Sequence, residues 1–303
     1  MQTPWGEFPV ADAHTHFFSR RLFQSLAAQA SRSVEQVIAL LGWELPADDP
    51  RELARVWVAE LDRHGVARAA LIASIPGDAA SVLAAQAERP DRFWAYAMVN
   101  PAAENAPVVE GLDAVCFFPA MHRYSIHDAR VQPWLDQAAA HGCAVFVHCG
   151  VLSVGVRKKL GLISPFDMRY SNPIDVHAIA LTYPDVPFIV PHFGAGFFRE
   201  ALMLADLCPN VYLDTSSSNS WIRYQGLDLK TVFRRALDVA GPARLLFGSD
   251  SSFFPRGWVA GVFEQQCQIL SDLGISAADA RLIFGGNLER ILQKAAPAKI
   301  SAQ

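Results

Sequence analysis

Histidine and aspartate side chains stand at the ends of four short apolar segments that are spread along almost the whole chain. The segments cover residues 10–16, 144–148, 188–192 and 245–250, and in this order they end in His14 and His16, His148, His192 and Asp250. Side chains two residues apart on a strand point to the same side, so His14 and His16 can converge on one ion. Neutral imidazoles with further nitrogen or oxygen ligands suit Zn²⁺ or a similar ion. We therefore expect a metal site at the tips of strands.

Four more apolar runs complete a set of eight expected strands, at 68–74, 93–99, 113–118 and 211–215. Stretches with helical spacing separate the strands, at 49–64, 78–88, 129–141, 173–182, 197–207, 229–240 and 257–273. Alternating β and α elements with continuously apolar strands predict a parallel sheet that is covered by helices. Eight such units in about 250 residues predict an α/β protein with the (β/α)₈ TIM-barrel fold. In that fold the C-terminal ends of all strands share one cavity, which brings the four segments together.

The whole chain, residues 1–303, is expected to form a single domain, because no linker rich in proline, glycine, serine or charge divides it. The segment 19–45, between the first strand and the next expected helix, is too long for an ordinary βα loop. We predict that it folds as an extra helix over the barrel mouth and forms part of a substrate lid.

Composition excludes several classes of function. The chain has 26 basic and 30 acidic residues, and no run of lysine and arginine that would follow a phosphate backbone, so nucleic acid is not an expected partner. It shows no signal-peptide pattern and no apolar run of the roughly 20 residues that span a bilayer, so a cytoplasmic protein without membrane contact is expected. Its five cysteines form no CxxC pair, which argues against a disulfide framework and against a thiolate zinc site.

The four segments resemble the motifs of the amidohydrolase superfamily, in the amidohydrolase-related branch. That branch includes aminocarboxymuconate semialdehyde decarboxylase, γ-resorcylate decarboxylase and lactone hydrolases. The matching residues are Asp12-Ala-His14-Thr-His16, His148-Cys-Gly150, Pro191-His192-Phe-Gly194, Phe247-Gly-Ser-Asp250 and the closing Gly286-Asn287-Leu-Glu-Arg290. The resemblance runs from the first strand to the C-terminal helix, and it does not specify the substrate.

The resemblance implies that His14, His16 and His148 bind the metal. Asp250 would complete the ligand set or carry a proton, and His192 would contact the reacting water or the substrate. Relatives with two metals bridge them through a carbamylated lysine near the end of the fourth strand, but here that strand reads Val115-Cys-Phe-Phe-Pro119. We therefore expect one divalent ion per chain, Zn²⁺ first and Mn²⁺ second.

Two reactions fit this ligand set. The first is hydrolysis of a small carboxylated ester, lactone or amide by a metal-activated water, because a bound Zn²⁺ lowers the pKa of its water from 15.7 to about 7. The alternative is non-oxidative decarboxylation of an aromatic or muconate-like acid. A barrel that only binds a ligand is disfavoured, because the ligand set is intact. Asp12 lies one layer below His14 and either orients the ligands or hydrogen-bonds the barrel floor.

Loop arginines indicate an anionic small-molecule substrate, because a guanidinium can bind a carboxylate through two hydrogen bonds. We take Arg157, Arg169 and Arg123 as the candidate substrate-binding residues, and Arg223 and Arg256 also follow strands. Relatives suggest a homodimer.

Overall fold

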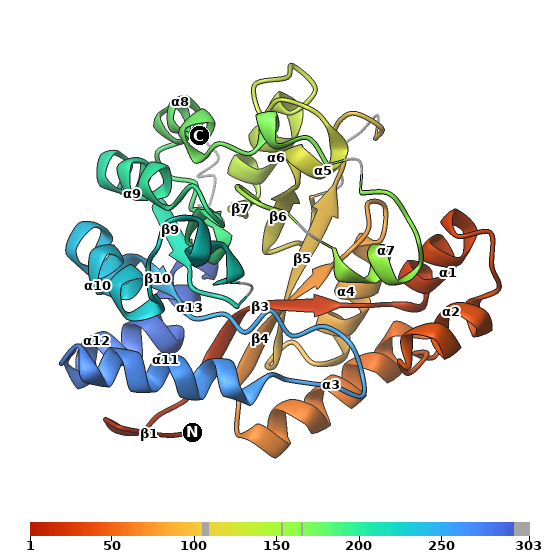
Figure 1. Ribbon diagram of the computed structural model, residues 1–303, viewed down its shortest axis with the longest axis horizontal. Coiled ribbons are helices and arrows are strands. Elements are labelled where there is room, and N and C mark those ends of the chain that lie inside the picture. The colour runs from red at the N-terminus through yellow and green to blue at the C-terminus, as the bar shows by residue number, and fades with distance from the viewer. Residues whose placement is uncertain (105–108, 153, 165, 218, 294–303) are drawn as a thin grey trace, which may run out of the picture.

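Eight parallel strands form one sheet in which the spatial order follows the order along the chain (Figure 1). They are β3 (Ala11–Phe17), β4 (Arg68–Ala73), β5 (Phe93–Val99), β6 (Ala114–Phe117), β7 (Ala144–Val147), β8 (Phe188–Val190), β9 (Val211–Asp214) and β10 (Leu245–Leu246). The computed structural model describes residues 1–104, 109–152, 154–164, 166–217 and 219–293, so 294–303 of the expected domain lie outside the described residues. Each of the eight expected strands is confirmed.

The sheet closes because β3 pairs with the segment that follows β10. Thr15 and Ser251 form a parallel bridge. The amide of Ala13 donates to the carbonyl of Phe247 at 2.8 Å, and the amide of Asp250 donates to the carbonyl of His14 at 2.9 Å. These bonds join the first and last strands, and the predicted TIM barrel is confirmed.

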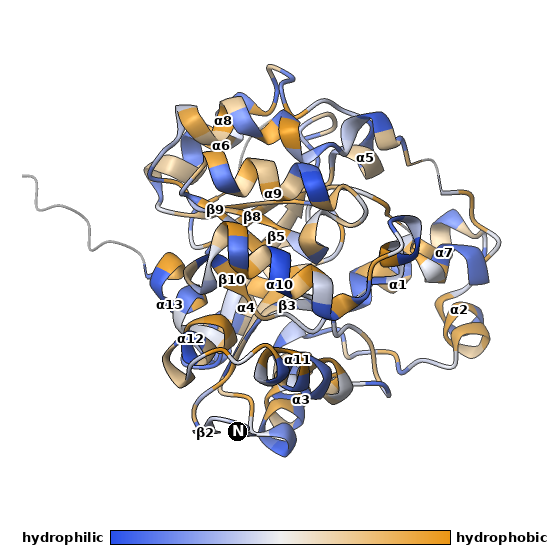
Figure 2. Ribbon diagram, turned by 60° about the vertical axis from the view of Figure 1, so that its left-hand side comes forward, coloured by the Kyte–Doolittle hydropathy of each residue, from blue (hydrophilic) through white to orange (hydrophobic). Residues whose placement is uncertain are grey.

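The expected helices surround the barrel. They are α3 (Pro50–His64), α4 (Ala79–Glu88), α6 (Gln132–Ala140), α8 (His177–Thr182), α9 (Phe198–Leu207), α10 (Leu229–Ala240) and α11 (Ala260–Asp272). Local chemistry explains their ends: Asp49 accepts a hydrogen bond from the amide of Arg51 at the start of α3, and Gly65 ends that helix at φ 71°. In Figure 2 the strands are mostly orange, while the helices around them carry both blue and orange residues. Apart from His16 and Arg68, every residue of the eight strands is buried, as their continuous apolar pattern predicts.

The segment 19–45 forms two helices, α1 (Arg20–Gln29) and α2 (Val34–Leu41), where one was expected. Ser33 and Gln36 form a capping box that starts α2. Leu26 on α1 and Leu41 on α2 pack in one apolar cluster with Val156 and Leu160. These last two residues belong to or follow α7 (Gly155–Lys159), which lies beside α1 in Figures 1 and 2.

The remaining elements are short. Two helices, α12 (Ala277–Arg281) and α13 (Asn287–Leu292), follow α11, and α5 (Pro119–His122) follows β6. A small antiparallel hairpin of β1 (Gln2–Thr3) and β2 (Gly6–Glu7) was not predicted from the sequence. It is anchored by Trp5, whose indole N–H donates to the carbonyl of Ile275 at 2.9 Å. Among the described residues, no helix has the length and apolar character that a membrane span requires.

Candidate metal centre and substrate cavity

His14 and His16 lie on β3 and meet the carboxylate of Asp250, which follows β10. The Nε2 atom of His16 lies 3.3 Å from Oδ1 of Asp250, and Nε2 of His14 lies 3.7 Å from the same oxygen. One ligand atom from each of the three residues lies within 4.8 Å of the others. Among the described residues, the buried Nε2 of His14 has no hydrogen-bond partner. Three possible ligand atoms, two from β3 and one from the segment after β10, therefore lie close together where the barrel closes.

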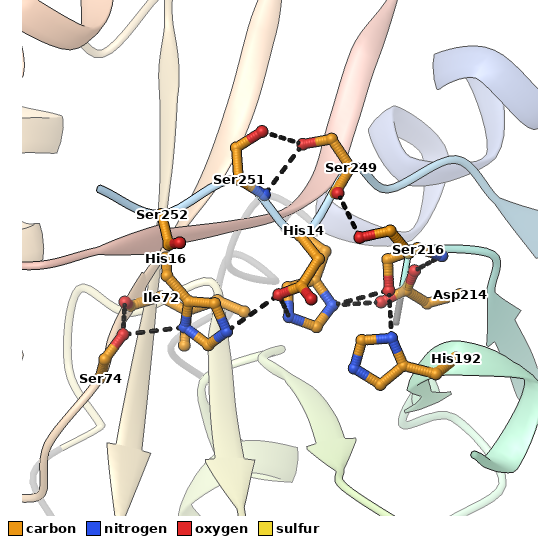
Figure 3. A network of polar contacts seen from close by, with 12 residues as sticks. His14, His16, Ile72, Ser74, His192, Asp214, Ser216, Ser249, Ser251 and Ser252 are labelled. Atoms are coloured by element: carbon orange, nitrogen blue, oxygen red, sulfur yellow. Dashed lines mark hydrogen bonds and ion pairs between the residues drawn. The ribbon is translucent and has the colours of Figure 1, made fainter. Parts of the chain in front are cut away.

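Hydrogen bonds on the far side of each ring set its tautomer (Figure 3). The Nδ1 atom of His14 lies 2.6 Å from Oδ2 of Asp214, which can only accept a proton when ionised. The Nδ1 atom of His16 lies 2.8 Å from Oγ of Ser74, and that hydroxyl donates its own proton to the carbonyl of Ile72 at 3.0 Å. We therefore place the proton of both rings on Nδ1. Both Nε2 atoms then carry a lone pair toward Asp250, as a divalent cation requires.

Neither Asp214 nor Ser74 was predicted from the sequence as a site residue. Asp214 ends the apolar strand β9, as Asp250 follows the apolar strand β10. An acidic residue at the end of an apolar run is therefore a sequence signal that could have identified Asp214. Ser74 follows β4 directly, but serine at the end of a strand is common and carries little information.

His148 and His192 extend the centre on the other side of His14. The ring centroids of His14 and His192 are 5.0 Å apart, and those of His192 and His148 are 5.4 Å apart. The hydroxyl of Ser216 lies 2.9 Å from Nδ1 of His192 and 3.1 Å from Nδ1 of His14, so it connects the two rings (Figure 3). His148 stacks on Phe118 and lies outside the compact group of three. Its role as a metal ligand stays a prediction.

Asp12 acts through the backbone. Its Oδ1 accepts hydrogen bonds from the amides of His14 at 2.9 Å and Ser249 at 3.0 Å, and its Oδ2 accepts from the indole of Trp258 at 2.7 Å. Burial raises the pKa of this carboxyl. Asp12 therefore holds β3 against the segment after β10, which fixes the relative positions of His14 and Asp250.

Two backbone features show how tightly the centre is built. Asp250 at φ 58° and His192 at φ 55° adopt the left-handed conformation, which is uncommon for residues with a Cβ. Gly248 approaches the site so closely that an added Cβ would lie 2.7 Å from Oδ1 of Asp214 and 2.8 Å from Cβ of His14. Glycine is therefore required there by space.

Comparison with known proteins assigns the family. The family model described as amidohydrolase matches residues 11–294. The chain belongs to the amidohydrolase family. It is an enzyme, and the solved relatives of this amidohydrolase include hydrolases and decarboxylases.

Three relatives give the range of likeness. Protein fluG of Emericella nidulans is 33% identical over 91 residues, which are 30% of this chain and 10% of fluG, so the chain matches only about a tenth of that protein. A putative 2-pyrone-4,6-dicarboxylic acid hydrolase from Pseudomonas putida is 18% identical with a TM-score of 0.60, and the match covers 94% of this chain and 98% of that one. The 5-carboxyvanillate decarboxylase from Novosphingobium aromaticivorans, complexed with manganese and 4-hydroxy-3-methoxy-5-nitrobenzoic acid, is 15% identical with a TM-score of 0.62, over 94% and 96% of the chains. The two structural matches establish a shared fold.

Burial and neighbouring charges set the protonation states in this amidohydrolase. Burial lowers the pKa of His192, and the neighbouring His14 lowers it further. Burial also lowers the pKa of His148 well below its usual value. Burial alone would raise the pKa of Asp250, but the surrounding imidazoles of His16, His14 and His192 hold it below its usual value. Burial opposes a charge on His14, but the carboxylates of Asp214 and Asp250 raise its pKa. The centre therefore offers neutral rings at His148 and His192 and an ionised carboxylate at Asp250 at neutral pH.

A cavity of about 700 Å³ opens from the metal centre. Phe18, Trp43 and Phe253 line one part of it, and Met98, Phe118 and Met121 line another. Residues of α1, such as Leu22 and Gln29, also border the cavity, so part of the segment 19–45 forms one of its walls. The cavity is large enough for a small molecule with an apolar body.

The structure separates the three candidate substrate-binding arginines. Arg157 lines the cavity, whereas Arg123 and Arg169 are not among the described residues that line it. Arg169 is 77% exposed and is paired with Asp167 at 2.6 Å. Arg256, which the sequence analysis noted without choosing it, lines the cavity next to Asp250.

We expect His122, at the end of α5 and on the cavity wall, to make the stability of the protein depend on pH. Its Nδ1 is buried without a partner among the described residues, and burial lowers its pKa from 6.5 to about 4. The unfolded chain takes up this proton near pH 6.5 and the folded chain only near pH 4, so stability is complete above pH 6.5 and is lost as the pH falls toward 4. The loss is about 2–3 kcal/mol, from roughly 1.4 kcal/mol per unit of pKa.

The measurement is urea unfolding of the wild type and of His122→Asn at pH 7 and at about pH 4.5. Contributions from the other histidines are shared by both proteins and cancel in the comparison. The variant should lose less stability than the wild type on acidification. Equal losses in the two proteins would contradict this assignment.

Proposed function

We propose that this amidohydrolase holds one divalent ion, Zn²⁺ first and Mn²⁺ second, and hydrolyses a small carboxylated ester, lactone or amide. The observation that carries the proposal is the pair of Nε2 lone pairs that Asp214 and Ser74 direct toward the carboxylate of Asp250. His14, His16 and Asp250 would hold the ion, with His148 as a further ligand. Nitrogen and oxygen donors of this kind suit Zn²⁺.

When bound, the ion acts as a Lewis acid that polarises a carbonyl group and makes water a better nucleophile at neutral pH. The residues of the chain supply the rest of the chemistry. Asp250, an ionised carboxylate beside the site, accepts a proton from water and returns it to the leaving group. His192, a neutral ring tied to Ser216, hydrogen-bonds the oxygen on which charge develops.

Decarboxylation is the second candidate, and the aromatic wall of the cavity favours it. The rings of Trp43 and Phe253 stack with centroids 4.0 Å apart, and Phe18 lies 5.9 Å from Trp43. A planar aromatic acid can lie against such a wall. Hydrolysis remains our first proposal, because it needs only the activated water, whereas decarboxylation also needs a planar acid held with its carboxylate at the metal.

The lid assignment of the segment 19–45 also remains a proposal. Its support is that α1 borders the cavity and that α1 and α2 pack in one apolar cluster with residues of α7. In a closed lid these helices would exclude water from the site.

We expect hydrolysis to be visible as transfer of oxygen from water. The metal-loaded enzyme is screened against lactones, esters and hydroxylated aromatic acids, and acid release and CO₂ release are read separately. The substrate that turns over is then incubated in ¹⁸O-labelled water. Label in a newly formed product carboxylate supports hydrolysis. Release of CO₂, with solvent deuterium on the product carbon, would reject hydrolysis and establish the alternative.

A further inference from the structure

Three cationic side chains line the cavity among the described residues, namely Arg157, Lys159 and Arg256. The guanidinium of Arg157 is already engaged. Its Nε and Nη2 donate to the carbonyl of Ile163 at 3.1 and 2.7 Å, and its Nη1 donates to Oε1 of Gln29 at 2.7 Å. Arg157 therefore connects α7 to α1, and each of its three guanidinium nitrogens already donates a hydrogen bond within the protein.

Arg256 is held at one nitrogen and open at the others. Its Nη2 donates to Oγ of Ser252 at 2.7 Å and to the carbonyl of Asp250 at 3.1 Å, and its Cζ lies 4.6 Å from the centroid of Phe253. Within the part of the chain that the structure describes, Nε and Nη1 have no hydrogen-bond acceptor, and no carboxylate lies within ion-pair distance. The side chain is accessible to solvent at the cavity. The protein therefore presents an oriented guanidinium that forms no ion pair with a carboxylate of the described residues, although the charge of Asp250 acts on it at longer range.

The position of Arg256 relative to the metal centre is fixed by Asp250. The carbonyl of Asp250 holds the guanidinium, while the carboxylate of the same residue lies 3.3 Å from Nε2 of His16. On the other side, Phe253 lies under the guanidinium and stacks on Trp43 with an interplanar angle of 12°. A cation, a flat aromatic surface and the candidate metal ligands are thus neighbours in one cavity.

We propose that Arg256 binds a substrate carboxylate that does not react, and thereby selects planar acids that carry this carboxylate beside the reacting group. The inference deepens the proposed function, and it rests on that function only in placing the reacting group at the metal. In hydrolysis the bound carboxylate is a separate group from the scissile ester, lactone or amide bond. In decarboxylation it is a second carboxylate. In either reaction the product keeps the carboxylate that Arg256 binds.

Calorimetric binding to the metal-loaded protein tests this assignment without turnover. The two probes are benzene-1,3-dicarboxylate and 3-carbamoylbenzoate, which differ only in whether the second group is a carboxylate or a neutral amide. Since a charge-assisted pair of hydrogen bonds is stronger than a neutral one, the wild type should prefer the dicarboxylate by about ten- to a hundred-fold. Arg256→Gln should reduce this ratio to near one, and Arg256→Lys, which keeps the charge but loses the planar fork, should give an intermediate ratio.

Arg199→Gln is the matched control, because it removes the same charge from an 82% exposed arginine of α9 that is paired with Glu200. It should keep the wild-type ratio. Circular dichroism and metal content verify that each variant is folded and loaded, and if Arg256→Gln does not fold, the lysine variant alone decides. An unchanged ratio in the Arg256 variants, a collapse of the ratio in Arg157→Gln instead, or no binding of either probe by the wild type would overturn the proposal. Failure of the proposed function has a different signature. The metal-loaded protein would then turn over no substrate while the ratio stays intact, and a protein that takes up no metal would already be identified by the metal analysis before the calorimetry.

Discussion

His14→Ala will empty the metal site and abolish activity. The substitution removes a ligand atom, and it also leaves the buried carboxylate of Asp214 without the ring that binds it at 2.6 Å. Elemental analysis of protein purified without added metal should find about one equivalent in the wild type and none in the variant. Asp214→Asn keeps the size of the side chain but weakens the acceptor for Nδ1 of His14, so we expect the metal affinity to fall by about 10- to 100-fold.

The control for this experiment is His127→Ala, which removes an exposed histidine. It should bind one equivalent, as the wild type does. Full metal content in His14→Ala would remove this residue from the ligand set. Two tightly held equivalents in the wild type, or none even after reconstitution, would contradict a site for one ion.

His192→Asn should behave in the opposite way, with full metal content and a large loss of rate. A side chain that contacts the reacting water or the developing charge contributes about 10²- to 10⁴-fold to kcat without holding the ion. The polar atoms of asparagine can replace the ring of His192 in its contact with the hydroxyl of Ser216. Ser216 also contacts His14, so His14 should keep its position. The measurements are kcat and metal content on the same preparations. An empty site in this variant would make His192 a ligand, and the assignment of His148 would then need revision.

The pattern of apolar runs was enough to predict the barrel. Every expected strand is present because these strands are buried on both faces, which forces continuous apolar sequence whatever their partners are. Helix ends were predictable where a local cap exists, as at Asp49 and Gly65. The hairpin at residues 2–7 was not predicted, because strands of two residues have no periodicity and Trp5 is held by a residue from the other end of the chain.

Of the side chains in the candidate site, only the carboxylates and imidazoles were predictable from the sequence. The rule that chemistry gathers at strand ends brings His14, His16, His148, His192 and Asp250 to one cavity, and the structure places them there. The same rule applies to Asp214, which was overlooked. The choice among the arginines stays a prediction, because whether a guanidinium is free depends on partners that are distant in sequence. Arg157 is bound by Gln29, whereas Arg256 has a free edge.

Asp12 connects the first strand to a loop that is 237 residues away along the chain, through the amide of Ser249. The proposed ligands His14 and Asp250 lie on the two sides of this seam, so the proposed set is complete only after the ends of the sheet have met. An ion that binds only the complete set stabilises the closed barrel and leaves the open sheet unaffected. Closure also joins residues 237 positions apart along the chain, and it is therefore expected late in folding. Uptake of the ion by a refolding chain is thus a measure of the moment at which the barrel closes.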